Sequence, residues 1–355
     1  MRKVTLDEVA AEAGVSKASA SKALNGRKDV SEATRKRVLD ACERLGYQRA
    51  PSKSVASRPT IALIADNLST TYTLEILKGA STAALQLGVD LLLSHTEFSD
   101  ADRPEVLPLT DEWIDGLVER GGVGVITVTS PASDALARRL SAARLAHVAI
   151  DPASTPGART TSIGATNWNG GVEATQHLVS LGHRRIGFIM GPESSVPSRE
   201  RFEGYLSALR MNSIPFEPTL VVGDAFSYEN GLNAGRRLLT YSDDQRPTAI
   251  FACNDIVAIG AYEAARELGF RIPEDLSVIG FDDTDIARWA SPALTTVRQP
   301  LGDMGARAVR TILTMAKEGE RAVHGPIQLT TRLAARKSTA PPPSGHLPES
   351  DSLIR

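Results

Sequence analysis

Between residues 60 and 338, short apolar segments alternate with amphipathic helical segments, and this alternation constrains the fold more than any other feature. A first series of apolar segments is TIALIA (60–65), VDLLLS (89–94), VGVITV (123–128) and AHVAID (146–151). A second series is TSIGAT (161–166), RIGFIMG (185–191), TLVVG (219–223), TAIFAC (248–253) and LSVIGFD (276–282). Continuous apolar strands separated by helices are typical of parallel sheets that are covered on both faces. The sequence therefore predicts an α/β body of two doubly wound, parallel-sheet lobes.

The chain is expected to cross between the two lobes three times, near residues 162, 292 and 325. The first lobe is then formed by about residues 60–162 and 293–324, and the second lobe by about residues 163–291 and 325–338. The segment 339–355 is rich in proline and serine and has no apolar period, so it is predicted to be disordered.

Polar and aromatic side chains follow the predicted strands, where ligands bind in doubly wound folds. These residues are Asp151, Arg199, Phe226, Asn254, Asp255, Asp282 and Gln299. Carboxylates and guanidinium groups make paired hydrogen bonds to vicinal hydroxyls, and an aromatic ring covers the C–H face of a sugar. Each residue also has an ordinary structural interpretation, because the aspartates could cap helices, Asn254 could satisfy loop backbone and Arg199 could be a surface cation. Their shared location at strand ends favours a binding site for a small carbohydrate.

The first 47 residues predict a separate bundle of three short helices. Thr5 and Glu8 have the spacing of a capping box at the start of the first helix, which Gly14 ends. Ser16 is a suitable N-cap for a second helix over residues 17–24, and a third helix runs from Ser31 to Gly46. Two short helices joined by a tight glycine turn and supported by a third form the helix-turn-helix pattern.

The second of these helices is predicted to read DNA. Its outward residues are Lys17, Ala18, Ser21 and Lys22. Such slim side chains with polar ends suit a major groove about 12 Å wide. Residues 1–58 hold 13 Lys/Arg and 7 Asp/Glu, a net charge of +6, whereas the remainder holds 27 and 35, a net charge of −8. A basic head on an acidic body favours a polyanion partner, although a helical bundle for protein contacts is the alternative.

The sequences VTLDEVAAEAGVSKASASKALNG and VSEATRKRVLDACERLGY resemble the head of the lactose-repressor (LacI/GalR) family of bacterial transcription regulators. The resemblance implies that this head contacts DNA through Thr5, Ser16, Lys17, Ala18, Ser21, Lys22, Asn25, Ser31 and Thr34. Arg35, on the third helix, is predicted to contact a phosphate.

The body resembles the same family, in the segments GHRRIGFIMGP, FACNDIVAIGAYEAARELGFRIPEDLSVIGFDD and SPALTTVRQP. The resemblance implies a periplasmic-binding-protein-like effector domain, in which matching motifs place Asp151, Arg199, Asn254 and Asp282 at effector contacts and Phe226 near an aromatic one. Thr70, Thr71 and Tyr72 occupy a loop that contacts ligand in the family. Trp168 either stacks on the ligand or seals the crossover between lobes.

The segment 48–59 is expected to be the hinge between head and body. Alone it is typical of a flexible linker, yet Pro51 could begin a short helix that Pro59 ends. In the family this stretch forms a hinge helix on operator DNA and inserts a leucine into the minor groove. Ala56 stands at the leucine position here, and Val55 is a weaker candidate wedge.

The sequence argues against an enzyme, because it has no GxSxG, HExxH, Walker A or dinucleotide motif. Neither the six histidines nor the two cysteines have metal-ligand spacing, so no metal or cofactor is predicted. A transport receptor is disfavoured by the DNA-binding head and by the absence of an export signal or membrane span. The resemblance and the strand-end residues together predict a cytoplasmic homodimer, or a tetramer, that binds double-stranded operator DNA and represses carbohydrate genes under control of a small sugar. Control by a partner protein is the alternative.

Overall fold

A computed structural model describes residues 4–24, 30–47, 58–100, 103–106, 109–131, 133–157, 160–319 and 325–343. The chain forms two compact units, Met1–Ser57 and Arg58–Arg355. The predictions for Asn25, for the hinge residues Val55 and Ala56, and for the tail beyond residue 343 lie outside the described residues.

The first unit contains the three predicted helices, α1 (Leu6–Glu12), α2 (Lys17–Leu24) and α3 (Glu32–Leu45). The capping box at α1 is confirmed, because Thr5 N donates to Glu8 Oε2 at 2.8 Å and Glu8 N donates to Thr5 Oγ1 at 3.4 Å. Gly14 and Gly46 both have φ of 63°, as the predicted helix ends require. Small side chains form much of the core, in which Val9, Ala10, Ala13, Ala20, Ala23, Val38 and Ala41 are buried.

The first lobe of the second unit is a parallel sheet in the order β13-β7-β6-β5-β1-β2. Its strands are β1 (Thr60–Ala65), β2 (Asp90–His95), β5 (Gly122–Val128), β6 (Ala146–Ile150), β7 (Thr161–Ala165) and β13 (Ile327–Leu329). Its helices are α4 (Thr71–Leu87), α5 (Asp111–Glu119), α6 (Asp134–Ala142) and α12 (Leu301–Glu318). An antiparallel hairpin of β3 (Glu97–Asp100) and β4 (Arg103–Val106) was not predicted.

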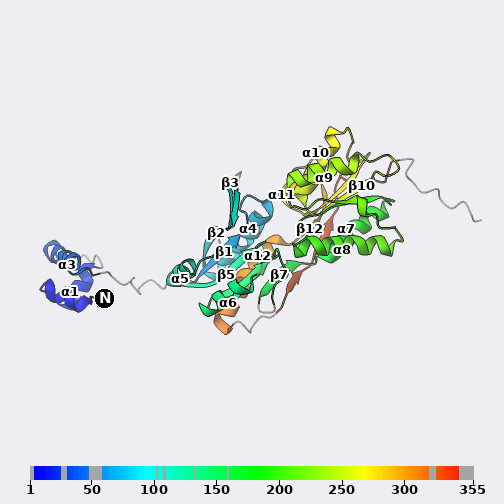
Figure 1. Cartoon of the computed structure of the whole chain (residues 1–355). Coiled ribbons are helices and arrows are strands. Elements are labelled where there is room, and N and C mark those ends of the chain that lie inside the picture. Colours follow the sequence, from blue (N-terminus) through cyan, green and yellow to red (C-terminus); the bar gives the residue numbers. More distant parts are fainter. Residues whose placement is uncertain are drawn as a thin grey trace, which may run out of the picture. The chain divides into compact units, whose positions relative to one another are not determined.

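The second lobe is a sheet in the order β14-β12-β11-β10-β8-β9, in which β14 runs antiparallel to β12. Its strands are β8 (Ile186–Ile189), β9 (Val221–Val222), β10 (Ala249–Ala252), β11 (Ser277–Asp282), β12 (Thr295–Arg298) and β14 (Arg332–Ala334). Its helices are α7 (Asn167–Ser180), α8 (Val196–Met211), the 3₁₀ turn η1 (Pro218–Leu220), α9 (Tyr228–Leu239), α10 (Asp255–Glu267) and α11 (Asp285–Trp289). Figure 1 shows the elements of each lobe around its own sheet.

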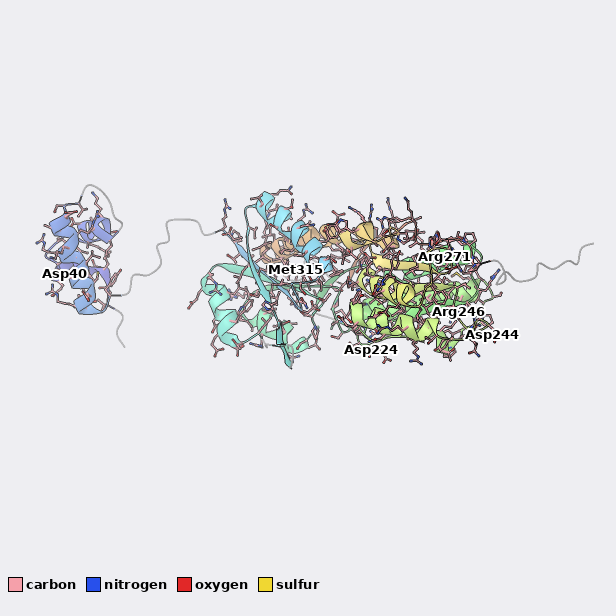
Figure 2. The ribbon with its side chains drawn as sticks, turned by 90° about the horizontal axis from the view of Figure 1, so that it is seen from above. Asp40, Asp224, Asp244, Arg246, Arg271 and Met315 are labelled. Carbon is pink, nitrogen blue, oxygen red and sulfur yellow. The ribbon has the colours of Figure 1, made fainter. Side chains whose placement is uncertain are left out.

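Glycines allow the helix pairs of each lobe to approach closely. A Cβ on Gly79 of α4 would lie 1.8 Å from the carbonyl oxygen of Gly302 in α12. In the second lobe, a Cβ on Gly171 of α7 would lie 2.4 Å from the carbonyl oxygen of Arg201 in α8. Met315 of α12 is buried in the first lobe, and Figure 2 shows it there. The same view places Arg246, whose guanidinium lies 4.8 Å from the Phe270 ring centroid, on the second lobe.

The predicted crossover positions, near residues 162, 292 and 325, are each several residues too early. β7 and β13 pair with each other in the first sheet, whereas β12 pairs with β11 in the second sheet. The chain therefore crosses after Ala165, after Arg298 and after Leu329. Hydrogen-bond pairing decides which sheet a short strand extends, and that pairing is not encoded in the apolar pattern of the strand itself.

The prediction that disorder begins at residue 339 is wrong for Thr339 and Ala340. The Thr339 hydroxyl bonds His177 Nε2 at 2.9 Å, and Ala340 N donates to Ser277 Oγ at 3.0 Å. The preceding Ser338 is fully buried and donates to Val278 O at 2.6 Å. These bonds attach the chain to the second lobe at least as far as residue 340.

Candidate functional site

A cleft of about 390 Å³ lies between the carboxyl ends of the two sheets. The first lobe contributes Asp66, Ser69, Thr70, Thr71, Tyr72, Thr129, Asp151 and Ala153. The second lobe contributes Pro192, Ser194, Ser195, Pro197, Arg201, Phe226, Asn254, Asp255, Ile256, Asp282, Thr284 and Ile286. A ligand in this cleft would touch both lobes.

On the first-lobe side, Tyr72 and Asp151 form a buried pair. Thr70 caps α4, so Tyr72 lies in the first turn of this helix and its hydroxyl donates to Asp151 Oδ2 at 2.6 Å. Asp151 follows β6 with φ of 39°, and a Cβ on Gly164 would lie 2.9 Å from its Oδ1. Burial raises the pKa of Asp151 to about 6. Burial and the neighbouring charge of Asp151 both raise the pKa of the Tyr72 phenol, to well above 10. This pair offers carboxylate acceptors to a ligand that carries hydroxyl donors.

On the second-lobe side, Arg201 is the cationic centre of the cleft. Its side chain is 3% exposed, and its guanidinium carbon lies 3.9 Å from the centroid of the Phe281 ring. Arg201 Nε donates to Asn167 Oδ1 at 2.9 Å and Nη1 donates to Cys253 O at 2.7 Å. Nη1 also lies 3.5 Å from Asp282 Oδ1, so a buried ion pair forms part of the cleft wall.

Two further carboxylates of the second lobe, Asp282 and Asp255, are held by short hydrogen bonds. Gln299 Nε2 donates to Asp282 Oδ1 at 2.6 Å, and Asp282 itself has φ of 110°. Asp255 accepts hydrogen bonds from Thr284 N at 2.8 Å and Thr296 Oγ1 at 2.6 Å. Burial raises the pKa of both carboxyl groups, and Asp282 raises that of Asp255 further.

An apolar surface on the second lobe complements these charges. Phe226 lines the cleft together with Ile256 and Ile286. A Cβ on Gly191 would lie 2.3 Å from the Phe226 ring, so the absence of a side chain at Gly191 allows the ring to rest on the backbone. The cleft therefore combines polar acceptors with an aromatic face, which is the combination that a sugar ring requires.

The structure brings most predicted effector residues into the cleft, namely Thr70, Tyr72, Asp151, Phe226, Asn254 and Asp282. Asn254 also has its structural role, because its side chain caps α10 by accepting from Val257 N at 3.0 Å. Gln299 is buried behind Asp282 rather than in the cleft lining.

The assignment of Arg199 to the cleft is wrong, and Arg201 takes its place. Arg199 Nη1 donates to the carbonyl oxygens of Glu193 and Ser194, both at 2.9 Å. Pro197 and Arg201 are four residues apart in α8 and both face the cleft, whereas Arg199 lies between them on the other side of the helix. The helical period after the Ser195 cap was the signal that could have identified Arg201.

The assignment of Trp168 to the effector site is also not supported by its location. Trp168 is 40% exposed and lines a separate surface concavity with Val172, His177 and other residues of α7. Sequence reasoning missed Asp66 and Thr129, which follow β1 and β5 at the same edge of the sheet. The strand-end rule that selected Asp151 would have selected both.

The candidate DNA-reading surface of α2 matches its predicted orientation. Ala20 and Ala23 are buried, while Lys17, Ala18 and Lys22 are exposed and Ser21 is half-buried. Ser16 caps this helix, because it accepts from Ser19 N at 3.1 Å. Lys17 Nζ lies 2.7 Å from Asp7 Oδ2, an exposed ion pair that DNA phosphates would compete with. Ser31 caps α3 and bonds Thr34, and Arg35 follows in the first turn.

Among the described residues, no group of three or more His, Cys, Asp or Glu side chains is placed to hold a metal ion. No described helix is long and apolar enough to span a bilayer.

Comparison with family models gives two matches. Residues 5–50 match the bacterial regulatory proteins of the lacI family, and residues 175–339 match the periplasmic binding protein-like domain. The HTH-type transcriptional regulator DegA of Bacillus subtilis is 32% identical over 343 residues, which cover 96% of this chain and 99% of DegA. CelR of Thermobifida fusca is 33% identical over 342 residues, which cover 95% of this chain and 98% of CelR.

Solved structures show the same similarity. A complex of the transcriptional regulator CelR with cellobiose has a TM-score of 0.68 and 31% identity, and the match covers 95% of this chain and 100% of CelR. The lac repressor dimer bound to operator and the anti-inducer ONPF has a TM-score of 0.67 and 29% identity, with 96% of this chain and 100% of that chain covered. The relatives compared are transcriptional regulators and not enzymes.

Proposed function

Because the chain belongs to the LacI family of bacterial DNA-binding transcriptional regulators, we propose that it is a homodimeric repressor whose operator binding is switched by a small carbohydrate. The carbohydrate binds in the cleft between the two lobes, and the genes controlled serve carbohydrate use. A relative in complex with cellobiose and a dimeric relative bound to operator support this proposal. The comparisons give no support to control by a partner protein.

The observation that carries the proposal is the composition of the cleft. Asp151 of one lobe faces the Arg201–Asp282 pair of the other, and Phe226 supplies an aromatic surface in the same cavity. Vicinal hydroxyls of a sugar can donate to the carboxylates while its C–H face covers the ring. Because the ligand touches both lobes, it favours the arrangement in which both sets of contacts form, and such differential affinity can shift a conformational equilibrium.

Isothermal titration of the full chain against mono- and disaccharides, including cellobiose and ribose, tests the carbohydrate assignment. We expect at least one sugar to bind, and we expect Asp282→Asn and Phe226→Ala to abolish the heat of binding. Arg210→Ala is the matched control, because Arg210 is exposed in the last turn of α8, outside the cleft lining, and should leave binding intact. If no sugar bound, or if Arg210→Ala had the effect of Asp282→Asn, this assignment would be rejected.

Binding-site selection with the full chain tests the DNA assignment. We expect a pseudo-palindromic site with half-sites about 34–36 Å apart, bound by a dimer. Lys22→Ala should cost about 1–3 kcal/mol at one base position, whereas Arg35→Ala should weaken all sequences alike and reduce the salt slope by about one unit. Protection of one isolated half-site by a monomer, or an unchanged sequence preference in Lys22→Ala, would contradict these roles.

A further inference from the structure

The first and third segments that join the two lobes are hydrogen-bonded to each other. Thr166 connects β7 of the first lobe to α7 of the second, and Thr331 connects β13 of the first lobe to β14 of the second. Thr331 N donates to Thr166 Oγ1 at 3.0 Å, and Thr331 Oγ1 donates to Thr166 O at 3.2 Å. Thr166 N in turn donates to Leu329 O at 2.9 Å. These two crossovers must therefore move together when the lobes move.

Asn167 connects this pair of crossovers to the cleft. It is the first residue of α7, and its side chain is 2% exposed. Asn167 Nδ2 donates to the carbonyl oxygen of Ala165, the last residue of β7, at 3.2 Å. Asn167 Oδ1 accepts from Arg201 Nε at 2.9 Å. One buried amide thus joins the cleft arginine to the last strand residue that the first lobe contributes before the chain crosses.

Gln299 makes the corresponding connection at the second crossover. It lies between β12 of the second lobe and α12 of the first, and it is 4% exposed. Its Nε2 donates to Asp282 Oδ1 at 2.6 Å and its backbone N donates to Asp282 O at 3.2 Å. Within the described residues, its buried Oε1 accepts no hydrogen bond. Gln299 thus holds the buried Asp282 carboxylate at the point where the chain crosses back to the first lobe.

We propose that Asn167 and Gln299 are positioning residues that transmit the arrangement of Arg201 and Asp282 in the cleft to the angle between the lobes. Arg201 Nη1 lies 3.5 Å from Asp282 Oδ1, which completes a continuous path from the first crossover to the second. Asp282 Oδ1 faces both Gln299 and Arg201, so a ligand donor that engages Asp282 alters both contacts at once. Coupling through packed, hydrogen-bonded side chains requires two arrangements of the molecule whose equilibrium can change. Here the two arrangements differ in the angle between the lobes.

The role of this hydrogen-bonded path in the ligand response rests on the proposed function. The effect of the path on the lobe angle does not, and a measurement without ligand tests it. Nitroxide labels at Glu112→Cys in the first lobe and Glu229→Cys in the second, in a Cys42→Ser background, report the distance between lobes in the full chain. Glu112 and Glu229 are exposed, and Cys253 is fully buried, so the labels go to the introduced cysteines. Dilution with unlabelled chain removes distances between subunits.

Asn167→Leu and Gln299→Leu remove the polar connections and keep much of the side-chain volume. We expect each to broaden or shift the distance distribution, and we expect the double variant to add little because both act on one path. Gln328→Leu, an exposed glutamine on β13, is the matched control and should leave the distribution unchanged. Where a leucine variant does not fold, Asn167→Ala and Gln299→Met provide second replacements that also remove the side-chain amide.

Two outcomes separate this inference from the proposed function. Distance distributions of the Asn167 and Gln299 variants that superimpose on the wild type would overturn the inference, whatever any sugar does. Addition of cellobiose and the other sugars to the labelled wild type forms the second measurement, in which the absence of any shift would count against the carbohydrate switch alone. We expect the wild type to respond to the sugar that binds, and the Asn167 and Gln299 variants to show a smaller change in distance when the same sugar is present at saturation.

Discussion

At the scale of single residues, the cleft is dominated by a charge imbalance in a buried setting. Among the described residues that line it, four aspartates, Asp66, Asp151, Asp255 and Asp282, accompany one arginine, Arg201. Removing ions from water costs several kcal/mol per ion unless partners compensate. Burial raises the pKa of both Asp151 and Asp282, and the charge of Arg201 partly offsets that rise. Arg201 therefore stabilises the ionised form of both carboxyl groups. The cleft is thus less stable than an apolar interior would be, which is the usual property of a binding site.

The first prediction compares the two arginines of α8. Arg201→Met leaves Asp282 buried without its cation, and we expect it to lower the free energy of unfolding by about 3–5 kcal/mol. Arg199 is half-buried, and Arg199→Met removes the hydrogen bonds that it donates to the carbonyl oxygens of Glu193 and Ser194. This change should lower the free energy of unfolding by about 1 kcal/mol or less. Urea unfolding of the full chain, followed by circular dichroism, measures both. Equal losses for the two variants would refute the assignment of Arg201 as the buried cation.

The second prediction concerns pH and Asp151. Its pKa is about 6 in the folded chain against an ordinary 3.8, so between these values the folded state binds more protons than the unfolded state. The contribution of Asp151 to stability is therefore present below about pH 4 and is lost, by about 3 kcal/mol, as pH rises through 6. Asp151→Asn removes this dependence while still accepting the Tyr72 hydroxyl.

The measurement is the difference in unfolding free energy between wild type and Asp151→Asn at a series of pH values. The unfolding free energy of Asp151→Asn should rise relative to that of the wild type from pH 4 to 6, and the difference should stay constant above pH 6. A difference that stayed flat across this window, or that changed with the opposite sign, would show that the folded carboxyl titrates normally.

Residue-scale predictions from sequence succeeded where a strand end alone determines position. Asp151 directly follows β6 and Asp282 is the last residue of β11, and the structure places both in the cleft. Arg199 failed because it lies on a helix, where the face depends on the rotation of α8 and not on closeness to the strand. Arg199 and Arg201 are two residues apart and therefore lie on different sides of α8. Only the four-residue spacing of the buried residues Arg201 and Tyr205 could have shown which arginine faces inward.

At the scale of elements, the strands were predictable but their membership of a sheet was not. β1 was predicted with its observed bounds, and β11 with its end at Asp282, because continuous apolar runs bounded by polar residues mark buried parallel strands. β7, β12 and β13 are three to five residues long and were assigned to the wrong lobe. Their place depends on long-range pairing, such as Ile327 with Ile163 across more than 160 residues, which no local pattern encodes.

The third prediction tests the C-terminal segment that attaches to the second lobe after β14. Ser338 Oγ donates to Val278 O at 2.6 Å and accepts from Thr295 N at 2.8 Å, so it satisfies backbone groups of two neighbouring strands. Ser338→Val leaves both groups buried without partners, and we expect a loss of about 1–3 kcal/mol in unfolding free energy. Ser180→Val, at the exposed end of α7, is the control and should change stability by a few tenths of a kcal/mol. Thermal or urea unfolding that showed no difference between the two variants would mean that the segment does not contribute to the fold.

At the scale of the whole body, each lobe carries large exposed apolar side chains on one of two neighbouring helices, α4 and α11. Leu74 and Leu85 of α4 are 44% and 77% exposed, and Trp289 of α11 is 74% exposed. Hydrogen bonding to Glu75 and, more weakly, the charge of Asp285 raise the pKa of Lys78, so α4 of the first lobe lies near α11 of the second. Figure 1 shows the two helices close together. Large exposed apolar side chains on neighbouring helices are typical of an interaction surface, and a second copy of the chain is the partner that the proposed homodimer requires.

The last prediction follows from this surface. In a two-fold dimer each substituted residue lies in the interface of both copies, so one charge introduced per chain is buried twice. We expect Leu85→Arg and Trp289→Arg each to shift the protein toward monomer in sedimentation velocity, because an unpaired buried charge is strongly unfavourable. Met211→Arg, at a residue that is 64% exposed at the end of α8, is the matched control and should leave the mass unchanged.

Since one head per half-site binds operator in the proposed function, monomeric variants should also lose operator affinity, while the heat of sugar binding persists because the cleft lies within one chain. Dimers of unchanged stability in both arginine variants would show that the copies associate through another face.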